Sequence, residues 1–170
     1  PLEERHTRYG YVVQIETATE TWSTRDVIGG IVPQLKRNPD GTKTLVYGVR
    51  HGCLTNAVLS NYVGYDGENV PNPDTLQRSE VVVKGQRYRG RWLVIDEFTR
   101  AHIDAAFGSL LTTLGGQRNA PLSIPTDDGV AAQVPLPRDF RIIGTLNSFD
   151  RHFLNQMSEA MKRRFVFIDL

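Results

Sequence analysis

Short apolar runs alternate with polar stretches rich in glycine and proline along this chain. Runs of consecutive apolar residues, many of them β-branched, predict strands because such side chains suit a pleated, buried surface. The predicted strands cover residues 11–15, 44–49, 92–95, 141–145 and 165–168, with an edge hairpin over 80–88. Where helices separate such strands, a parallel α/β sheet is expected.

Apolar residues at helical spacing predict the helices. Their clearest example runs from Ile103 to Leu114, where apolar residues recur every three or four positions before Gly115 and Gly116. Further helices are predicted over residues 24–35, 55–60 and 152–164. The first of these is weakened by Gly29, Gly30 and Pro33, because glycine and proline disfavour a helix interior.

Two stretches have the character of insertions. Residues 61–79 carry glycine, asparagine, aspartate and proline with no periodicity, so we expect a loop that belongs to an insertion over 61–91. Residues 117–139 hold two short apolar pieces on either side of Asp127-Asp128-Gly129, which predicts a hairpin insertion. The residues Asn38-Pro39-Asp40-Gly41 form a strong turn signal. The chain of residues 1–170 is otherwise expected to form one domain.

Composition and charge are typical of an ordinary globular domain and do not indicate a particular function. The chain has 170 residues, of which 39% are hydrophobic and 23% charged, as in an ordinary soluble domain. Its net charge of +1 favours no particular partner. The single cysteine, Cys53, excludes an intrachain disulfide, and the four histidines lack metal-ligand spacing. No apolar run is long enough to span a membrane, so a cytoplasmic protein is the default expectation.

Two adjacent carboxylates are the first candidates for chemistry. Asp96 and Glu97 directly follow the apolar run Trp92–Ile95. At the carboxyl end of a buried parallel strand such a pair can anchor Mg²⁺ and polarise an attacking water. The structural alternative is that the two acids only cap the following helix, where its dipole favours anions. The pair alone does not decide between these readings.

The other candidates are weaker when taken singly. Asn147 follows the predicted strand 141–145 and could orient water or a phosphate, or could simply be a turn residue. Arg163 and Arg164 end a predicted helix, where cations are stabilising without any function. In a functional reading they would deliver positive charge to a nucleotide on a neighbouring subunit.

The order of these segments resembles the AAA+ superfamily. The segment LVIDEFTRA (93–101) looks like a Walker B segment, IIGTLNSFDR (142–151) like a sensor 1 segment, and MKRRFVFIDL (161–170) like the arginine-finger region with the last strand. The hairpin expected before the sensor strand is similar to the insertion found in the dynein-related, MoxR and McrB branch. LNSFDR (146–151) is closely similar to the corresponding segment of McrB-like restriction GTPases. The resemblance therefore implies a partial P-loop NTPase core of three α/β/α layers.

The resemblance also implies roles for individual residues. Asp96 would hold Mg²⁺, through water, Glu97 would activate water, and Asn147 would sense the γ-phosphate. Arg163 or Arg164 would act as a finger in trans. Supporting roles near the nucleotide fall to the matched residues Asp150 and Arg151, and Arg100 is expected at the subunit interface.

At the level of the whole protein, the resemblance implies ATP, or GTP, as the nucleotide and a homo-oligomeric ring, with a hexamer expected. The work done would be remodelling or translocation of a macromolecule. DNA or a McrC-like partner protein would fit the McrB branch, and remodelling of a protein complex would fit the MoxR branch.

The chain departs from the family pattern at one essential motif. The sequence G-x-x-x-x-G-K-[ST], whose backbone and lysine hold the phosphates, does not occur in these 170 residues. Nor is there a counterpart of the C-terminal helical lid. Either the chain is a fragment of a longer NTPase, which we favour, or it is a degenerate relative. In both cases we expect little hydrolysis by these residues alone, and exposed sheet edges that favour self-association.

Two rival functions remain open. A metal-dependent nuclease would use Asp96 and Glu97 with a nearby lysine, but no lysine lies between positions 85 and 161. A non-enzymatic scaffold or DNA-binding module would use the basic stretch around Tyr88, which could follow a phosphate backbone or line a ring pore. The residues of this stretch are Lys84, Arg87, Tyr88 and Arg89. A basic edge hairpin that merely discourages strand pairing is the plain alternative.

Overall fold

A parallel sheet organises the chain in a computed structural model that describes residues 8–67, 69–110, 113, 120–147, 154 and 157–169. Its central strand is β5 (Gln86–Asp96), which pairs in parallel with β1 (Arg8–Thr17) on one side and β8 (Ile142–Gly144) on the other. The short strand β4 (Val81–Val83) folds back antiparallel onto the start of β5. The predicted mixed α/β fold with a parallel sheet is therefore confirmed.

The hairpin predicted over 80–88 is confirmed, and its second strand is longer than expected. Lys84 and Gly85 form its two-residue turn, with φ angles of 50° and 79° that match a turn suited to the twist of a β-hairpin. The strand that follows runs without a break into the apolar run Trp92–Ile95. The basic stretch and the acidic pair thus belong to the two ends of one strand.

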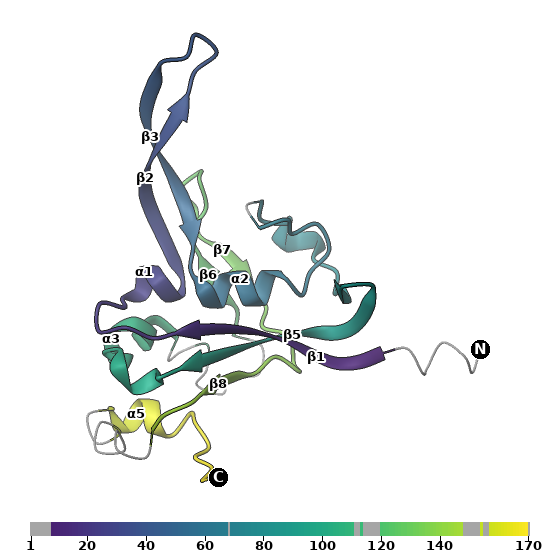
Figure 1. Cartoon of the computed structure of the whole chain (residues 1–170), viewed down its shortest axis with the longest axis vertical. Helices are drawn as coiled ribbons and strands as arrows, with labels where there is room; N and C mark the ends of the chain where they lie inside the picture. The colour runs from purple at the N-terminus through teal and green to yellow at the C-terminus, as the bar shows by residue number, and fades with distance from the viewer. Residues whose placement is uncertain are drawn as a thin grey trace, which may run out of the picture.

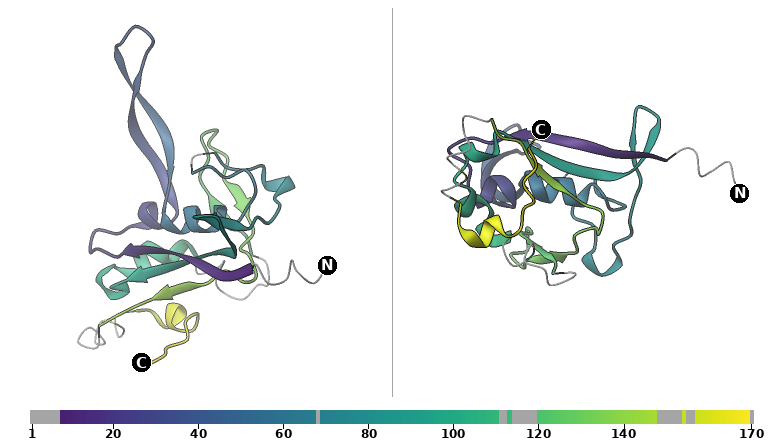
Figure 2. Two further views of the ribbon diagram at one scale, coloured as in Figure 1. Left: turned by 45° about the vertical axis from the view of Figure 1, so that its right-hand side comes forward. Right: turned by 90° about the horizontal axis from the view of Figure 1, so that it is seen from below.

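Three short helices cover one face of the sheet, as Figure 2 shows. They are α1 (Thr24–Val27), α2 (Cys53–Leu59) and α3 (Ile103–Phe107). Helix α3 continues into the 3-10 turn η4 (Gly108–Leu110), and the remainder of the predicted helix 103–114 lies largely outside the described residues. Beneath these elements the sheet buries Leu93 and Ile95 completely.

The predicted helix over residues 24–35 is wrong beyond its first turn. Helix α1 ends at Val27, and Gly29 with a φ of 123° turns the chain into β2 (Gly29–Arg37). This strand pairs antiparallel with β3 (Lys43–His51) across the predicted turn 38–41. The apolar residues of this segment satisfy both a helical and an alternating pattern, and the glycines and Pro33 decide in favour of the strand.

The long hairpin β2–β3 rises away from the body of the molecule in Figure 1. A second, shorter hairpin lies beside its base and consists of β6 (Leu122–Ile124) and β7 (Ala132–Val134), as predicted for residues 117–139. The remaining described elements are short: η2 (Pro73–Thr75), η3 (Phe98–Arg100) and α5 (Glu159–Lys162). The segment 61–79 is otherwise irregular, as expected.

The predicted strand over residues 165–168 is also wrong. These residues have no regular secondary structure, and Val166 and Ile168 are exposed. Only Phe165 packs inward, against the ring of Phe98 at a centroid distance of 5.5 Å. An apolar run becomes a strand only when a neighbouring strand accepts its hydrogen bonds, and no described strand pairs with this run.

Candidate functional site

The carboxyl ends of the three parallel strands bring the acidic pair together with the residues after β8. The Asp96 carbonyl accepts a hydrogen bond from the Ala18 N–H at 2.9 Å, just beyond β1. On the other side the Thr145 N–H donates to the Ile95 carbonyl at 2.9 Å. Residues that follow three separate strands therefore converge at one edge, as expected for a site on a parallel sheet.

Asp96 is exposed and points to the side of the sheet that the helices do not cover. Its parity along β5 is that of Trp92 and Val94, whereas Leu93 and Ile95 face the helices. One oxygen of its carboxylate accepts a hydrogen bond from the Thr145 hydroxyl. This contact orients the carboxylate, so that its other oxygen can bind a cation or accept a hydrogen bond from water.

Thr145 was missed as a site residue by sequence reasoning. The sheet register places Ile95 opposite Gly144 and therefore Asp96 opposite Thr145, which brings the two side chains together. That register could not be derived from the sequence, since it depends on which strands are neighbours. A hydroxyl at the end of the adjacent strand was the feature to look for.

Glu97 has a backbone conformation that is unusual for its residue type. Its φ of 53° and ψ of 40° lie in the left-handed region, which costs a residue with a β-carbon about 1–3 kcal/mol. The conformation is maintained by the next residue, since Phe98 donates its N–H to the Thr145 carbonyl at 2.9 Å and buries its ring. Backbone strain of this kind is concentrated at functional sites, so the Glu97 geometry supports the functional reading of the pair.

A close contact with Gly144 fixes this arrangement. A β-carbon on Gly144 would lie 2.9 Å from the ring of Phe98, so only glycine allows the ring to sit over the end of β8. Phe98 in turn packs edge-on against Phe107 of α3, with centroids 5.3 Å apart. The turn that carries Glu97 is therefore held by packing rather than by the acid itself.

The Glu97 carboxylate pairs with Arg100 one turn later. The distance from Oε2 to Nη1 is 2.9 Å, and both side chains are more than one third exposed. An exposed ion pair contributes little to stability, but it can orient the carboxylate. The expected interface residue Arg100 thus reaches the acidic pair within its own chain.

The other predicted residues are not all brought to this edge. Asn147 is exposed and lies two residues beyond Thr145. Arg164 donates from Nη1 to the Ala160 carbonyl at 2.6 Å, so it caps the end of α5, as the structural alternative expected. Arg163 is exposed at the same helix end. Asp150 and Arg151 lie outside the described residues.

The basic stretch lies at the opposite end of β5 from the acidic pair. Asp96 lies nine positions beyond Arg87, which corresponds to about 30 Å along a strand. Tyr88 donates its hydroxyl to Gln86, and Arg87 lies 3.9 Å from the Glu80 carboxylate. Lys84 occupies the turn, and Arg89 is exposed farther along the strand. These residues cannot contact a ligand held at Asp96.

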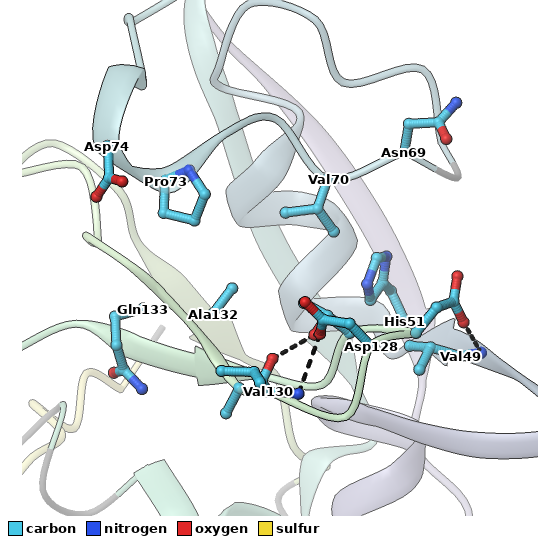
Figure 3. A pocket seen from close by; sticks show the side chains of 13 residues that line it. Val49, His51, Asn69, Val70, Pro73, Asp74, Asp128, Val130, Ala132 and Gln133 are labelled. Atoms are coloured by element: carbon cyan, nitrogen blue, oxygen red, sulfur yellow. Dashed lines mark hydrogen bonds between the residues drawn. The ribbon is translucent and has the colours of Figure 1, made fainter.

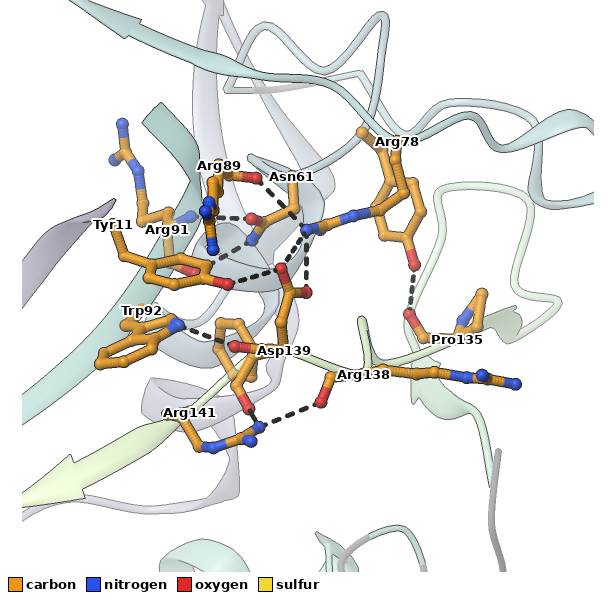
Figure 4. A network of polar contacts seen from close by, with 12 residues as sticks. Tyr11, Asn61, Arg78, Arg89, Arg91, Trp92, Pro135, Arg138, Asp139 and Arg141 are labelled. Carbon is orange, nitrogen blue, oxygen red and sulfur yellow. Dashed lines mark hydrogen bonds and ion pairs between the residues drawn. The ribbon is translucent and has the colours of Figure 1, made fainter. Parts of the chain in front are cut away.

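A polar network consolidates that same end of the sheet (Figure 4). Asp139 accepts hydrogen bonds from the Tyr11 hydroxyl at 2.9 Å and from Arg78, whose Nη2 lies 2.9 Å from Oδ1. Burial together with the Asp139 carboxylate raises the pKa of Tyr11. Trp92 donates its indole N–H to the Asp139 carbonyl and stacks on Tyr11 at 4.4 Å. The network is structural, since its members bind one another.

The single cysteine of the chain lies away from this site and is unreactive. Cys53 is buried at the start of α2, and burial raises the pKa of its thiol to about 12. A thiol with such a pKa is not a nucleophile at neutral pH.

Among the described residues, no group of three or more His, Cys, Asp or Glu is placed to hold a metal ion by itself. Every described helix is too short or too polar to cross a membrane.

Comparison with known proteins identifies the family of the chain. A family model described as AAA domain (dynein-related subfamily) matches residues 2–165. No curated protein matches the chain significantly. The matched region includes nearly the whole chain, and with it the three strand ends and both shorter hairpins.

Proposed function

Because the chain belongs to the dynein-related subfamily of AAA domains, we propose that it carries the hydrolytic acid pair of an AAA+ NTPase. The observation that supports this proposal best is the strained Glu97 next to Asp96, at the meeting point of three parallel strand ends. A pair that only capped a helix would not need a left-handed glutamate. The bound nucleotide would be ATP, with GTP as the alternative.

Asp96 would hold Mg²⁺ through water. The donor set fits, because Mg²⁺ is usually bound by one or two carboxylates, water and substrate phosphates rather than by a closed protein cage. Asp96 offers an exposed carboxylate, and the Thr145 hydroxyl orients it. The ion would supply charge neutralisation for the phosphates.

Glu97 would polarise the attacking water. A carboxylate positions a water by accepting its hydrogen bond, and the ion pair with Arg100 restricts the Glu97 side chain to one direction. Asn147 would donate to the γ-phosphate from the same edge of the sheet. Asp150 and Arg151 would support the site from the segment that follows.

The arginines at the end of α5 would act on a neighbouring subunit. Arg163 is the better candidate for the finger, because Arg164 is already bonded to the Ala160 carbonyl of its own helix. A guanidinium supplied in trans would neutralise charge that develops during phosphoryl transfer. This role requires a homo-oligomeric ring, for which a hexamer is our proposal.

The open face of the sheet is where we place the phosphate-binding segment. Val13 and Ile15 are 47% and 64% exposed there, and Asp96 lies at the carboxyl end of the same face. A segment that carries the phosphate loop would bury these side chains and bring the phosphates to Asp96. For this reason the 170 residues alone would hydrolyse nucleotide poorly.

The work driven by hydrolysis would be remodelling or translocation of a macromolecule in the cytoplasm. The segment LNSFDR favours a McrB-like role on DNA, with a McrC-like partner protein, over MoxR-like remodelling of a protein complex, whereas the pre-sensor hairpin β6–β7 fits both. The basic residues Lys84, Arg87, Tyr88 and Arg89 would contact the phosphate backbone. A degenerate scaffold without hydrolysis is the alternative.

Hydrolysis by the full gene product tests the proposal. We expect Glu97→Gln to lower kcat by roughly 100-fold or more, the scale of a positioned general base, while nucleotide binding is retained. The matched control Glu20→Gln changes an exposed glutamate on a turn and should leave kcat unchanged. Equal rates for Glu97→Gln and the control would exclude Glu97 from catalysis and favour the scaffold.

A further inference from the structure

The hairpin β2–β3 rises away from the rest of the described chain (Figure 1). The apolar face that it presents is exposed except near its base, where Val49 is half-buried and lines a pocket. The register of the hairpin places three apolar pairs on one face, each two residues from the next along the strands. Leu35 and Tyr47 are 67% and 71% exposed. The three pairs are Ile31 with Val49, Pro33 with Tyr47, and Leu35 with Leu45.

The geometry of these pairs brings their side chains close together. The N–H of Val49 donates to the Asp127 carboxylate at 2.7 Å, so it points away from β2. Pairs of this kind in an antiparallel ladder are the non-hydrogen-bonded ones, with Cα atoms about 4.5 Å apart. Pro33 fits the same positions because it lacks an N–H. The result is a continuous apolar strip on a two-stranded ribbon, which is marginally stable unless it packs on something.

The ribbon is cationic, and three of its four cations lie near its tip. Residues 29–51 contain four cations (Lys36, Arg37, Lys43 and Arg50) and one anion (Asp40), a net charge of +3. The whole chain has a net charge of only +1, so residues outside the ribbon sum to −2. A partner that covers the ribbon should therefore combine apolar surface with negative charge.

The same chain contains a surface of that description (Figure 3). An open pocket of about 650 Å³ lies between the base of β3, η2 and the β6–β7 hairpin. Three aspartates and no lysine or arginine line it, together with apolar side chains. The acids are Asp74, Asp127 and Asp128, and the apolar residues are Val49, Val70, Pro73, Val130, Ala131 and Ala132.

Hydrogen bonds favour the charged form of one of these acids, Asp128. The pKa of Asp128 is lowered by the hydrogen bond from the Thr126 hydroxyl and by the Val130 N–H. Burial lowers the pKa of His51, which therefore adds no positive charge to the wall. Val49 and His51 at the base of the hairpin line this pocket, but the tip of the same hairpin rises away from it and cannot fill it (Figure 1).

We propose that the β2–β3 hairpin of one copy docks into this pocket on a second copy. The Leu35–Leu45 pair would contact the apolar wall, and the next pair on the same face, Arg37 with Lys43, would face the three aspartates. The tip and the pocket are different surfaces, so the contact is heterologous and can propagate from copy to copy. A nucleic acid would match the cations but would leave the aliphatic strip exposed, so the protein surface is the better fit.

Charge reversal with rescue tests this contact in the 170-residue chain. The tip variant combines Arg37→Glu with Lys43→Glu, and the pocket variant combines Asp74→Lys with Gln133→Lys. All four positions are exposed and should tolerate the change. Every chain also carries Ile15→Ser, which disfavours any association through the open sheet face, so that the measurement reports on the hairpin contact.

Light scattering over a range of concentrations measures the assembly. We expect the reference chain to associate, and the tip or pocket variant to raise the dissociation constant by roughly tenfold or more. The chain that carries all four changes should regain part of the association, because Asp74→Lys with Gln133→Lys takes the charge of the pocket wall from −3 to 0, and the two new lysines can pair with the glutamates of the tip. Leu35→Ser with Leu45→Ser should weaken association in both charge backgrounds, whereas the control Lys84→Glu with Arg87→Glu should not.

Three outcomes would overturn the proposal. The reference chain could be monomeric, or the tip and pocket variants could associate as strongly as the reference chain. The third outcome is that the variant with all four substitutions does not regain association although circular dichroism shows that it is folded. A further outcome is that the tip variant loses affinity for a duplex DNA oligonucleotide while assembly is unchanged. That result would assign the ribbon to nucleic acid and contradict the protein contact. None of these outcomes depends on nucleotide hydrolysis, so the proposal can fail while the proposed function stands.

Discussion

The two faces of the central sheet differ sharply although the same strands build both. On the covered face, Leu93 and Ile95 are 0% exposed beneath the helices, and Asn61 joins α2 to β5 through buried hydrogen bonds. On the open face, Val13 and Ile15 are largely exposed, and Tyr11 and Trp92 stack on each other rather than under a helix. Both faces carry aliphatic residues, so the sequence pattern indicates only that either face could be covered. The packing in the structure shows which face is covered.

The largest difference should come from truncating one aliphatic residue on each face. Leu93→Ala removes a fully buried side chain and should lower the free energy of unfolding by about 2–5 kcal/mol. Ile15→Ala on the open face should change it by less than about 0.5 kcal/mol, because the side chain is already in contact with solvent.

Urea unfolding of the 170-residue chain, followed by circular dichroism, measures both values. Equal losses would mean that the open face is packed in solution and would remove the contrast between the faces.

A smaller difference is expected for the polar groups on the two faces. The Asn61 side chain accepts from the Arg91 N–H at 2.7 Å and donates to the Ala57 and Arg91 carbonyls, in buried or partly buried surroundings. Asn61→Ala leaves these backbone groups without partners and should cost about 1–3 kcal/mol. Tyr11→Phe removes one hydrogen bond to Asp139 near solvent and should cost about 0.5–1.5 kcal/mol.

The same unfolding measurement ranks these two variants. Asn61→Asp serves as a further comparison for Asn61, since it keeps the acceptor and loses the donor. A greater loss for Tyr11→Phe than for Asn61→Ala would show that the open side of the sheet carries more of the stability than its exposure indicates.

Sequence reasoning was most successful where one pattern excluded the others. The continuous apolar run Trp92–Ile95 predicted a buried parallel strand, and the structure pairs it with parallel neighbours on both sides. The acidic pair was identified by its place after that run. Both features could be predicted because they depend only on neighbouring residues: an unbroken apolar run indicates a buried strand, and the two acids mark the end of that strand.

Failures came where the outcome depends on a neighbour. The apolar residues at 24–35 fitted a helix until Gly29 turned the chain and β3 supplied hydrogen bonds. The run 165–168 has strand-forming residues but no described strand to pair with. Thr145 became a site residue only through the register of β8 against β5. Strand pairing is a long-range property, and one sequence does not encode it as a local pattern.

The most direct test of the account is the chemical accessibility of the open face. Cys53 is an internal reference, because it is buried with a pKa of about 12 and should react slowly with a maleimide in any context. Ile15→Cys should be labelled rapidly in the 170-residue chain and slowly in the full gene product with nucleotide, while Glu20→Cys is labelled rapidly in both. If Ile15→Cys reacts equally fast in both proteins, no phosphate-binding segment packs on this face, and the proposed nucleotide site at Asp96 is contradicted.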